Sequence, residues 1–507
     1  MNAEKLQNLI LYRYRYAFAY IVMILVSVGA LAYRINELLP GPSPSEISQG
    51  LAITQDSTTI LEQGVYLPYN LLQTISIGVF GESTLALRLP SVVFGFLILV
   101  MMYLLIHIWH REKIAIISII FLATSSWFLT FARSGTPYIY VAFSIVLIFL
   151  SGTLLRHGSN RKRALLFSAL VLPLTLYSPY MVYILALYVF LYRAELTATI
   201  QGMNRSDLAV VGVVGFATIL PLIYAFVTSL DNIQIWLGID EGIPSIKQFF
   251  ENVFSGIRHI LWHSQPNPEF HLANLAMLDI FTSTMAALGL YHYEKHFNWM
   301  RTRFIIYGLA VSLLVFGLSS DEGRYFMVAP IIYILAATGI ITLLNQWNRI
   351  FPINPFARTL ALIPLALALL VTTQYHTDRY FSAWASSPAT RKVYAIEPTL
   401  LESHLDLSGA ERILIVASAS EHPALAFLLN DSAVGRAIDI IDVDEGERLT
   451  NFPTRYDSVY IDGNNTGELK QRLDSYISEA INNDRESRPI AYRVYDLKTK
   501  VGYAVNY

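Results

Sequence analysis

Long apolar stretches alternate with short charged segments along the first 376 residues of the chain. A helix that crosses a bilayer needs about 20 mostly apolar residues, because its backbone polar groups must be satisfied inside the span. Eleven windows have this character: 16–33, 89–108, 114–132, 137–155, 164–178, 180–194, 208–229, 274–291, 304–319, 325–344 and 359–376. The pattern predicts a polytopic α-helical membrane protein with about 11 transmembrane helices, of which the fifth and sixth are joined by a tight outer hairpin.

The charges between these windows indicate how the chain is oriented. If the N-terminus lies inside, the inner segments hold 16 lysines and arginines and the longer outer segments hold six. Because inner loops carry the positive charge, we expect a multi-pass protein of the cell membrane with a cytoplasmic N-terminus and an extracytoplasmic C-terminus. The first window lacks a small-residue cleavage site, so it is predicted to be a retained helix rather than a signal peptide.

Composition changes sharply after the last window. Residues 377–507 hold 20 of the 38 carboxylates, which predicts a membrane domain over 1–384 and a soluble domain over 385–507. Strand-like segments occur at 412–418, 437–443, 458–462, 491–496 and 501–505, and helix-like segments at 424–429 and 469–480. This order predicts a small C-terminal α/β domain with a partly parallel sheet. The segment 418–421 after its first strand contains no glycine, so a nucleotide-binding phosphate loop is not expected there.

Overall composition narrows the class of function. The chain is 54% apolar and 15% charged, and its net charge of −2 argues against a nucleic-acid partner. The absence of cysteine excludes disulfides and thiol catalysis. Two outer loops are long, 34–88 and 230–273, and the second is rich in aromatic residues, as is typical of segments that contact membrane lipids at the interface. Because the inner loops are short and basic, we expect any chemistry to face outward.

The first outer loop offers an acidic residue close to the membrane. Glu46 follows a proline-stiffened run and opens a predicted helix over 47–54. A carboxylate at this place can serve as a general base. The alternative is that it stabilises the N-terminus of the helix electrostatically.

Three arginines lie at the outer ends of predicted spans, where the charge rule does not expect them. They are Arg88, Arg133 and Arg324. A phosphate partner would explain such residues. The competing interpretation pairs them with the acids Glu37, Asp321 and Glu322.

The second long loop contains histidines, and the span that follows contains an acid. His259 and His263 are four residues apart, which would place two imidazoles on one helical face, near His271 and Glu269. A divalent metal site is one interpretation of this pair. Asp279 lies inside a predicted span, where acids are functional candidates. Its alternative is satisfaction by neighbouring polar groups: Asn274, Thr282 and Ser283.

Together these segments resemble a known family of membrane enzymes. The motifs are Phe80-Gly81-Glu82, Leu87-Arg88-Leu89-Pro90-Ser91, Ala132-Arg133, Leu278-Asp279, Arg324-Tyr325 and Tyr380-Phe381 followed by Trp384. In order and placement they resemble the GT-C superfamily of glycosyltransferases, in the family 39/83 group of protein O-mannosyltransferases and the aminoarabinose transferase of lipid A. The resemblance covers residues 15–385.

The resemblance implies transfer of a sugar from a polyprenyl-phosphate donor to a lipid, glycan or protein acceptor. Such enzymes use an Asp-Glu motif in the first outer loop, and the corresponding residues here are Ser45-Glu46. Three interpretations remain: Glu46 serves alone, Glu37 or Asp56 substitutes, or activity is lost. The implied substrate-binding residues are Arg88, Arg133, Asp279, Arg324 and Tyr325.

Two other functions compete with a transferase. A flippase for lipid-linked glycans predicts internal repeats and helices broken at mid-membrane, and the sequence shows no such repeat. A catalytically silent scaffold that binds a partner through its outer tail is the third hypothesis, which the serine at position 45 favours.

Overall fold

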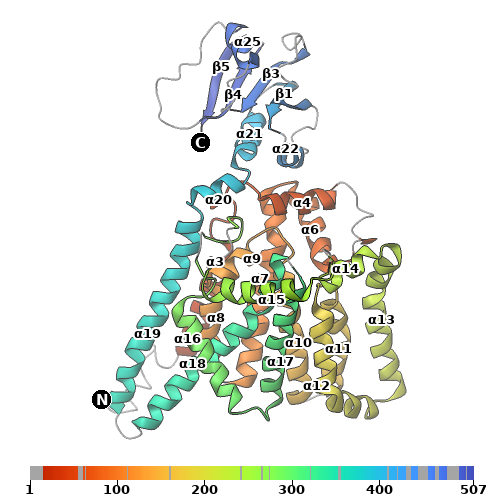
Figure 1. Ribbon diagram of the computed structural model, residues 1–507, viewed down its shortest axis with the longest axis vertical. Helices are drawn as coiled ribbons and strands as arrows, with labels where there is room; N and C mark the ends of the chain where they lie inside the picture. The colour runs from red at the N-terminus through yellow and green to blue at the C-terminus, as the bar shows by residue number, and fades with distance from the viewer. Residues whose placement is uncertain are drawn as a thin grey trace. The chain divides into compact units, whose positions relative to one another are not determined.

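Every apolar window of the sequence contains helix in the computed structural model (Figure 1). The structure describes residues 15–54, 61–62, 64–110, 112–158, 161–239, 242–263, 267–272, 275–319, 321–351, 355–407, 410–418, 421–429, 436–443, 455–462, 468–476, 490–497 and 500–506. The window helices are α3 (Arg15–Ala32), α7 (Thr84–Trp109), α8 (Glu112–Ala123), α9 (Ser126–Ala132), α10 (Ile139–His157), α11 (Arg161–Thr175), α12 (Met181–Gln201), α13 (Arg205–Thr228), α16 (Ile280–Glu294), α17 (Met300–Leu318), α18 (Ala329–Ile350) and α19 (Pro355–Asp378). Within the described residues, six helices are long and apolar enough to span a membrane, or seven if the bent α8–α9 pair forms one span. The chain therefore has several membrane-spanning helices, and the count of eleven stays a prediction.

The third window does not form the continuous helix that its apolar run predicts. The pair α8 and α9 bends by 66° at a short break. Ser125 begins the second piece as its N-cap, and its hydroxyl accepts a hydrogen bond from the Phe128 N–H at 3.4 Å. A serine cap competes locally with helix continuation. This break sets α9 at an angle, with residues of its first turn beside the pocket described below.

Shorter helices occupy the outer loops and the connections. They are α4 (Pro44–Thr54), α6 (Leu67–Phe80), α14 (Asp231–Leu237), α15 (Ile246–Leu261), the 3-10 helix η1 (Glu322–Met327), the π-helix η2 (Arg379–Trp384), α20 (Pro388–Val393) and α21 (Ile396–Leu407). Contacts divide the chain into two units, the first made of 1–35, 56–73 and 88–385 and the second of 36–55, 74–87 and 386–507. Two pieces of the first outer loop join the tail in the second unit, and the domain bounds 1–384 and 385–507 stay a prediction.

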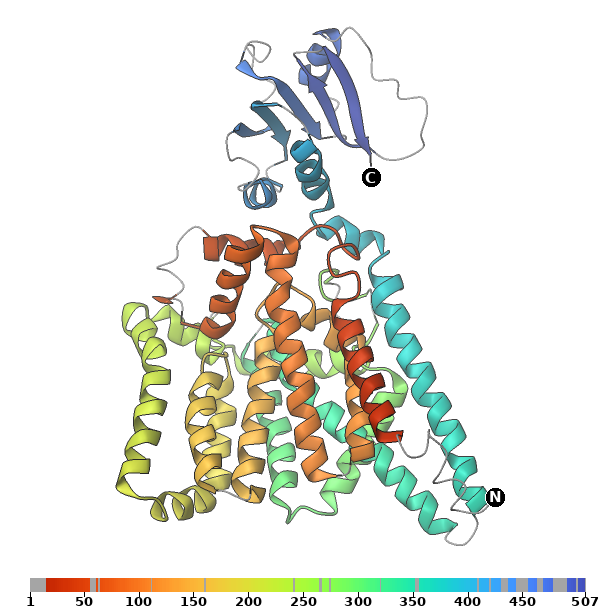
Figure 2. The same cartoon turned by 180° about the vertical axis from the view of Figure 1, so that it is seen from behind.

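The first unit is a bundle of helices, with α3 and α19 on the side seen in Figure 2. Its helix α10 is buried along most of its length. The helices α16 and α18 approach closely where two glycines face the partner backbone. A Cβ atom on Gly289 or on Gly339 would lie 1.9 Å from a carbonyl oxygen of the other helix. Such small residues let membrane helices pack backbone against backbone.

The second unit contains a five-stranded sheet in the order β2-β1-β3-β4-β5. The strands are β1 (Arg412–Ala417), β2 (Ala437–Asp442), β3 (Ser458–Asp462), β4 (Ile490–Asp496) and β5 (Val501–Asn506). Strand β1 pairs parallel with β2 and β3, whereas β3, β4 and β5 are antiparallel. The predicted partly parallel sheet and closing hairpin are confirmed.

Side chains of alternate residues in β1 enter two apolar cores, as the strand period requires. Ile413 and Ile415 pack in one core with α21 and α22 (His422–Leu428). Leu414 and Val416 pack in the other with α25 (Glu468–Tyr476). Both faces of the sheet are therefore covered by helices.

A third apolar cluster joins the tail to the first outer loop inside the second unit. Ile47 of α4 and Leu87 pack with Phe427 of α22. Gly50 permits this contact, because a Cβ atom there would lie 2.7 Å from the Phe427 ring. Beside the cluster lies a groove of about 1030 Å³ whose lining includes Glu37, residues of α4, and residues of α20 and α21.

Candidate functional site

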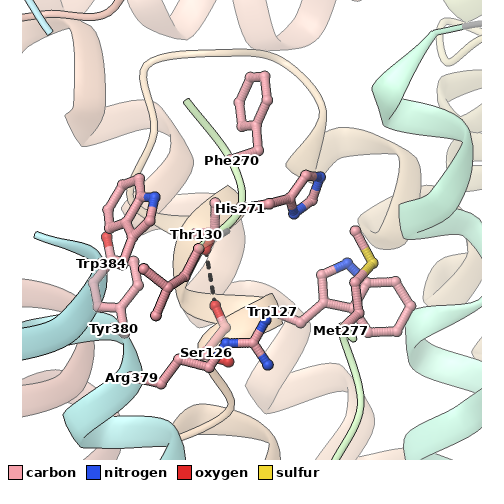
Figure 3. A pocket seen from close by; sticks show the side chains of 10 residues that line it. Ser126, Trp127, Thr130, Phe270, His271, Met277, Arg379, Tyr380 and Trp384 are labelled. Atoms are coloured by element: carbon pink, nitrogen blue, oxygen red, sulfur yellow. Dashed lines mark hydrogen bonds between the residues drawn. The ribbon is translucent and has the colours of Figure 1, made fainter. Parts of the chain in front are cut away.

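A small pocket in the first unit lies among α9, the segment before α16, and η2 (Figure 3). It is lined by Ser126, Trp127, Thr130, Phe270, His271, Leu272, Met277, Arg379, Tyr380 and Trp384. Its volume is about 20 Å³, enough for roughly one water molecule. A pocket of this size is too small for a whole sugar.

Two buried arginines lie at this pocket: Arg133 lies over the ring of Tyr380 in its wall, and Arg379 precedes Tyr380 in the chain and lines the pocket. The Arg133 guanidinium lies 5.4 Å from the centre of that ring and 4.9 Å from the Phe381 ring. Arg133 also donates to the carbonyls of Ala30 and Tyr33, at 2.8 and 2.6 Å. Arg379 lines the pocket itself. The site thus holds two cations at 4% and 9% exposure, stabilised by carbonyl oxygens and π-faces.

Arg88 lies close enough to Arg133 for its positive charge to affect the pKa of Arg133. Burial lowers the pKa of Arg133, Tyr380 opposes that shift, and the neighbouring Arg88 cation adds to it. Arg88 is 4% exposed and donates to the Ile35 carbonyl at 2.9 Å. The predicted outer-end arginines Arg88 and Arg133 are therefore brought together.

Arg324 belongs to a second polar cluster, on η1. Its Nη2 donates to the Tyr325 hydroxyl at 2.6 Å. Its Nε and Nη1 atoms meet no hydrogen-bond partner within the described part of the chain, although the residue is 4% exposed. A guanidinium has five N–H donors, so this one can bind a further acceptor such as a phosphate oxygen.

Two histidines and a glutamate gather beside Arg324. His259, His271 and Glu322 place one ligand atom each within 4.8 Å of one another, and the His271 Nε2 lies 3.3 Å from the Glu322 Oε2. Burial and the neighbouring His271 lower the pKa of His259 to about 3, so its imidazole is neutral at neutral pH. Neutral imidazoles and a carboxylate are suitable ligands for a divalent metal.

The predicted pairing of His259 with His263 does not form. Helix α15 ends at Leu261 and Trp262 is its C-cap, so His263 lies beyond the last turn and its side chain is exposed. The second imidazole beside His259 is His271 instead, with ring centroids 4.5 Å apart. The i, i+4 argument was wrong because it assumed a helix two residues longer than the one that forms.

Asp279 caps a helix and also belongs to a chain of hydrogen-bonded side chains that leads to the pocket. It is the N-cap of α16, where its side chain accepts from the Thr282 N–H at 2.9 Å. Its other oxygen hydrogen-bonds the His376 Nε2 at 2.9 Å, and the His376 Nδ1 lies 2.9 Å from the Ser126 hydroxyl in the pocket wall. This carboxylate–imidazole–hydroxyl chain can hold or relay a proton.

Asp321 is the acid of the η1 segment that the arginine-pairing interpretation named. Burial raises the pKa of its carboxyl, and hydrogen bonds from Tyr138 and Tyr180 act in the opposite direction. The Tyr180 hydroxyl donates to it at 3.1 Å. Asp321 is therefore satisfied by tyrosines, and no ion pair with an arginine is found for it among the described residues.

Glu46 lies in the second unit, at 0% exposure. Its Oε2 accepts from the Ser43 N–H at 2.9 Å, while the Ser43 hydroxyl accepts from the Glu46 N–H at 3.2 Å. This reciprocal pair is a capping box, so the helix-terminus interpretation of Glu46 is confirmed as a structural role. A meeting of Glu46 with the arginines of the first unit stays a prediction. Glu37 is exposed and lines the groove of the second unit, and Asp56 lies outside the described residues.

Comparison with known proteins shows what this fold is similar to. The family model described as dolichyl-phosphate-mannose-protein mannosyltransferase matches residues 67–224. ArnT from Cupriavidus metallidurans in the apo state aligns with a TM-score of 0.52 at 12% identity, over 91% of this chain and 94% of ArnT. The fold is that of the GT-C glycosyltransferases.

Two further structures share the GT-C fold. ArnT bound to undecaprenyl phosphate aligns with a TM-score of 0.51 at 13% identity, over 94% of this chain and 97% of ArnT. The Archaeoglobus fulgidus oligosaccharyltransferase, tethered to an acceptor peptide, aligns with a TM-score of 0.51 at 12% identity, over 84% of this chain and 64% of that one. No curated protein sequence matches the chain. The resemblance to O-mannosyltransferases and ArnT that the motifs indicated is confirmed.

The GT-C fold brings together residues that sequence patterns did not. His376 ends the last window and Arg379 follows it, and neither was singled out, while Glu322 was named only as an arginine partner. Each meets its partner across a long stretch of chain, such as 103 residues between Arg379 and Ala276, whose carbonyl it binds at 2.6 Å. The signals that pointed to this region were the motif around Tyr380, the outer-end arginine Arg133 and the acid Asp279.

Proposed function

We propose that this chain is a glycosyltransferase that moves a sugar from a polyprenyl-phosphate-linked donor to an acceptor hydroxyl on the outer face of the membrane. The GT-C fold and the match to the mannosyltransferase family model support it. So does the ArnT structure, which was solved with undecaprenyl phosphate bound. The observation that carries the proposal is the pair of buried arginines, Arg133 and Arg379, at Tyr380.

The arginines suit the leaving group of such a reaction. When the bond from the anomeric carbon to the phosphate oxygen breaks, the polyprenyl phosphate keeps the electron pair and its negative charge. Cations fixed in a low-dielectric site stabilise that charge without reorganising. The Nε of Arg133 has no hydrogen-bond partner within the described residues, so it can donate to a phosphate oxygen. Arg324 offers two further donors of the same kind.

Glu46 is the proposed general base. Its carboxylate would take the proton of the acceptor hydroxyl as the acceptor oxygen forms its bond to the anomeric carbon, with inversion. The capping box fixes the carboxylate at the start of α4 before substrate binds. The groove of about 1030 Å³ beside α4 is the proposed acceptor site. The proposal places the N-terminus inside, eleven spans in the membrane, and the 385–507 domain outside.

The test is an assay of the purified full chain in lipid nanodiscs with a panel of polyprenyl-phosphate-linked sugars. We expect sugar transfer, or slow hydrolysis of the donor when no acceptor is supplied. Glu46→Gln should lower turnover by about 10²–10⁴-fold. Glutamine also fits the capping box, so the thermal unfolding midpoint of this variant should stay close to that of the wild type.

Two matched variants make the result specific. Glu62→Gln changes an exposed acid of the same loop that does not line the groove, and it should leave turnover unchanged. Glu46→Ala removes both the base and the cap, so it should lose turnover and also unfold at lower temperature. Full turnover in Glu46→Gln with loss in Glu37→Gln would transfer the role of base to Glu37. Translocation of the donor with its sugar intact would favour a flippase.

A further inference from the structure

We propose that His259, His271 and Glu322 form a binding site for a Zn²⁺ ion. Their ligand atoms lie within 4.8 Å of one another. Ligands about 2.1 Å from a tetrahedral Zn²⁺ lie about 3.4 Å apart, and the His271 Nε2 and Glu322 Oε2 are already 3.3 Å apart. The remaining distances reach the ideal value through side-chain shifts on the order of 1 Å.

The three side chains come from separate segments that are held together by backbone contacts. His259 lies in the last turn of α15, whose Asn252 donates to the Gly317 carbonyl at 3.3 Å. The His259 carbonyl accepts from the Met277 N–H at 3.3 Å, which ties the end of the helix to the segment after His271. Glu322 opens η1. A site whose ligands are supported in this way is preorganised for an ion.

Burial and ligand type point to zinc rather than to magnesium or calcium. His259 is 0% exposed and His271 is 5% exposed, and the His259 ring stacks on Tyr325 with centroids 4.5 Å apart. Two imidazoles and one carboxylate match Zn²⁺, whereas Mg²⁺ and Ca²⁺ prefer all-oxygen sites. The Arg324 cation next to the trio repels any cation, so only a metal with a strong affinity for imidazole would be retained there.

Three protein ligands leave one of the four positions of a tetrahedral ion open. Zinc sites of this His₂Glu composition can bind water or a substrate oxygen at that position. His271 also lines the small pocket beside Arg379 and Tyr380, so an ion bound to His271 would lie next to that pocket. The inference stands on the trio alone and does not depend on the proposed transferase activity.

The experiment measures zinc in the purified full chain after removal of any polyhistidine tag. The protein is stripped with a chelator, incubated with ZnCl₂, passed through a desalting column, and analysed for metal by mass spectrometry. We expect one zinc ion per chain and a higher thermal unfolding midpoint with zinc than without it. His271→Gln and Glu322→Gln should each weaken zinc binding by at least about 10-fold.

His263→Gln is the matched control, since it removes an exposed histidine from the same loop. This variant should bind zinc as the wild type does. His259→Gln tests the third ligand in the same way. If this variant fails to fold, the absorption spectrum of bound Co²⁺ in the wild type and in His271→Gln is compared, and we expect the spectrum to change when the His271 ligand is lost. A wild-type chain that retains no zinc would overturn the proposal, as would equal zinc binding in the wild type, His271→Gln and Glu322→Gln.

Discussion

Arg133 holds a structural position and a proposed catalytic one at once. Its guanidinium hydrogen-bonds two carbonyls at the end of α3 and lies over two aromatic rings. If it also stabilises the leaving phosphate, Arg133→Gln should lower kcat/KM by about 10²–10³-fold. Arg133→Lys keeps the charge and loses the planar fork, so it should recover part of that loss. The measurement is kcat/KM together with the thermal unfolding midpoint of each variant.

Arg301 is a suitable control for this experiment. It donates to the Trp109 carbonyl at 2.9 Å and lies 4.3 Å from the Trp299 ring, so its environment is similar, but it belongs to the predicted inner segment 295–303 rather than to the outer end of a span. Arg301→Gln should lower the unfolding midpoint and leave kcat/KM unchanged. If both glutamine variants lose the same fraction of kcat/KM, Arg133 acts through stability alone.

At the residue scale, three arginines could be identified from the sequence because their positions depart from the positive-inside rule. Arg88, Arg133 and Arg324 stood out because arginines are not expected at outer ends of spans, and all three prove to be buried. Their partners could not be found in this way, because backbone carbonyls carry no sequence signal. The proposed metal ligands show the same limit: His271 and Glu322 are 51 residues apart and meet only through tertiary packing.

At the scale of elements, the contact between α4 and α22 connects the tail to the helix that carries Glu46. Gly50→Ala tests how tight this contact is. Alanine favours a helix over glycine by about 1 kcal/mol, but its Cβ would lie 2.7 Å from the Phe427 ring and 3.0 Å from Leu87. Overpacking costs about 1–3 kcal/mol. We therefore expect a net loss of stability in chemical unfolding of the full chain.

Gly78→Ala is the control for this prediction, because a Cβ atom there meets nothing within 4 Å. It should be neutral or stabilising. Adding Phe427→Leu to Gly50→Ala should recover stability relative to the sum of the two single changes, since a smaller side chain makes room for the new methyl group. Additive effects would show that the two helices are not in close contact.

Most elements followed from apolar periodicity, and the exceptions have local causes. The strands β1, β2 and β3 lie within one residue of their predicted ranges, because each is a short apolar run bounded by polar residues. The break between α8 and α9 was missed, since Thr124 and Ser125 are common in membrane helices and only the cap geometry shows that the helix stops. The end of α15 was missed for a similar reason, as Trp262 carries no strong stop signal.

At the scale of the whole molecule, the composition of the chain predicts a membrane part and a soluble tail. It does not predict which pieces of the first outer loop pack with that tail. The change in charge at residue 377 indicated a soluble tail. It gave no sign that 36–55 and 74–87 would belong to the same unit as the tail. These pieces pack through ordinary apolar side chains, such as Ile47 and Leu87, which look the same in a sequence whether they face lipid or another helix.

Membrane topology is the last prediction, and the composition of the chain makes it direct to test. Because the chain has no cysteine, a single introduced thiol is the only labelling site. Ser206, in the first turn of α13, and Ser475, in α25, are both exposed. With an inside N-terminus and eleven spans, a membrane-impermeant maleimide should label Ser475→Cys in right-side-out vesicles. It should label Ser206→Cys only after the vesicles are opened. Labelling of both from outside would require an even number of spans between them, whereas the prediction requires five. The reverse pattern would invert the protein and place Glu46 and the arginines on the face opposite to the proposed donor.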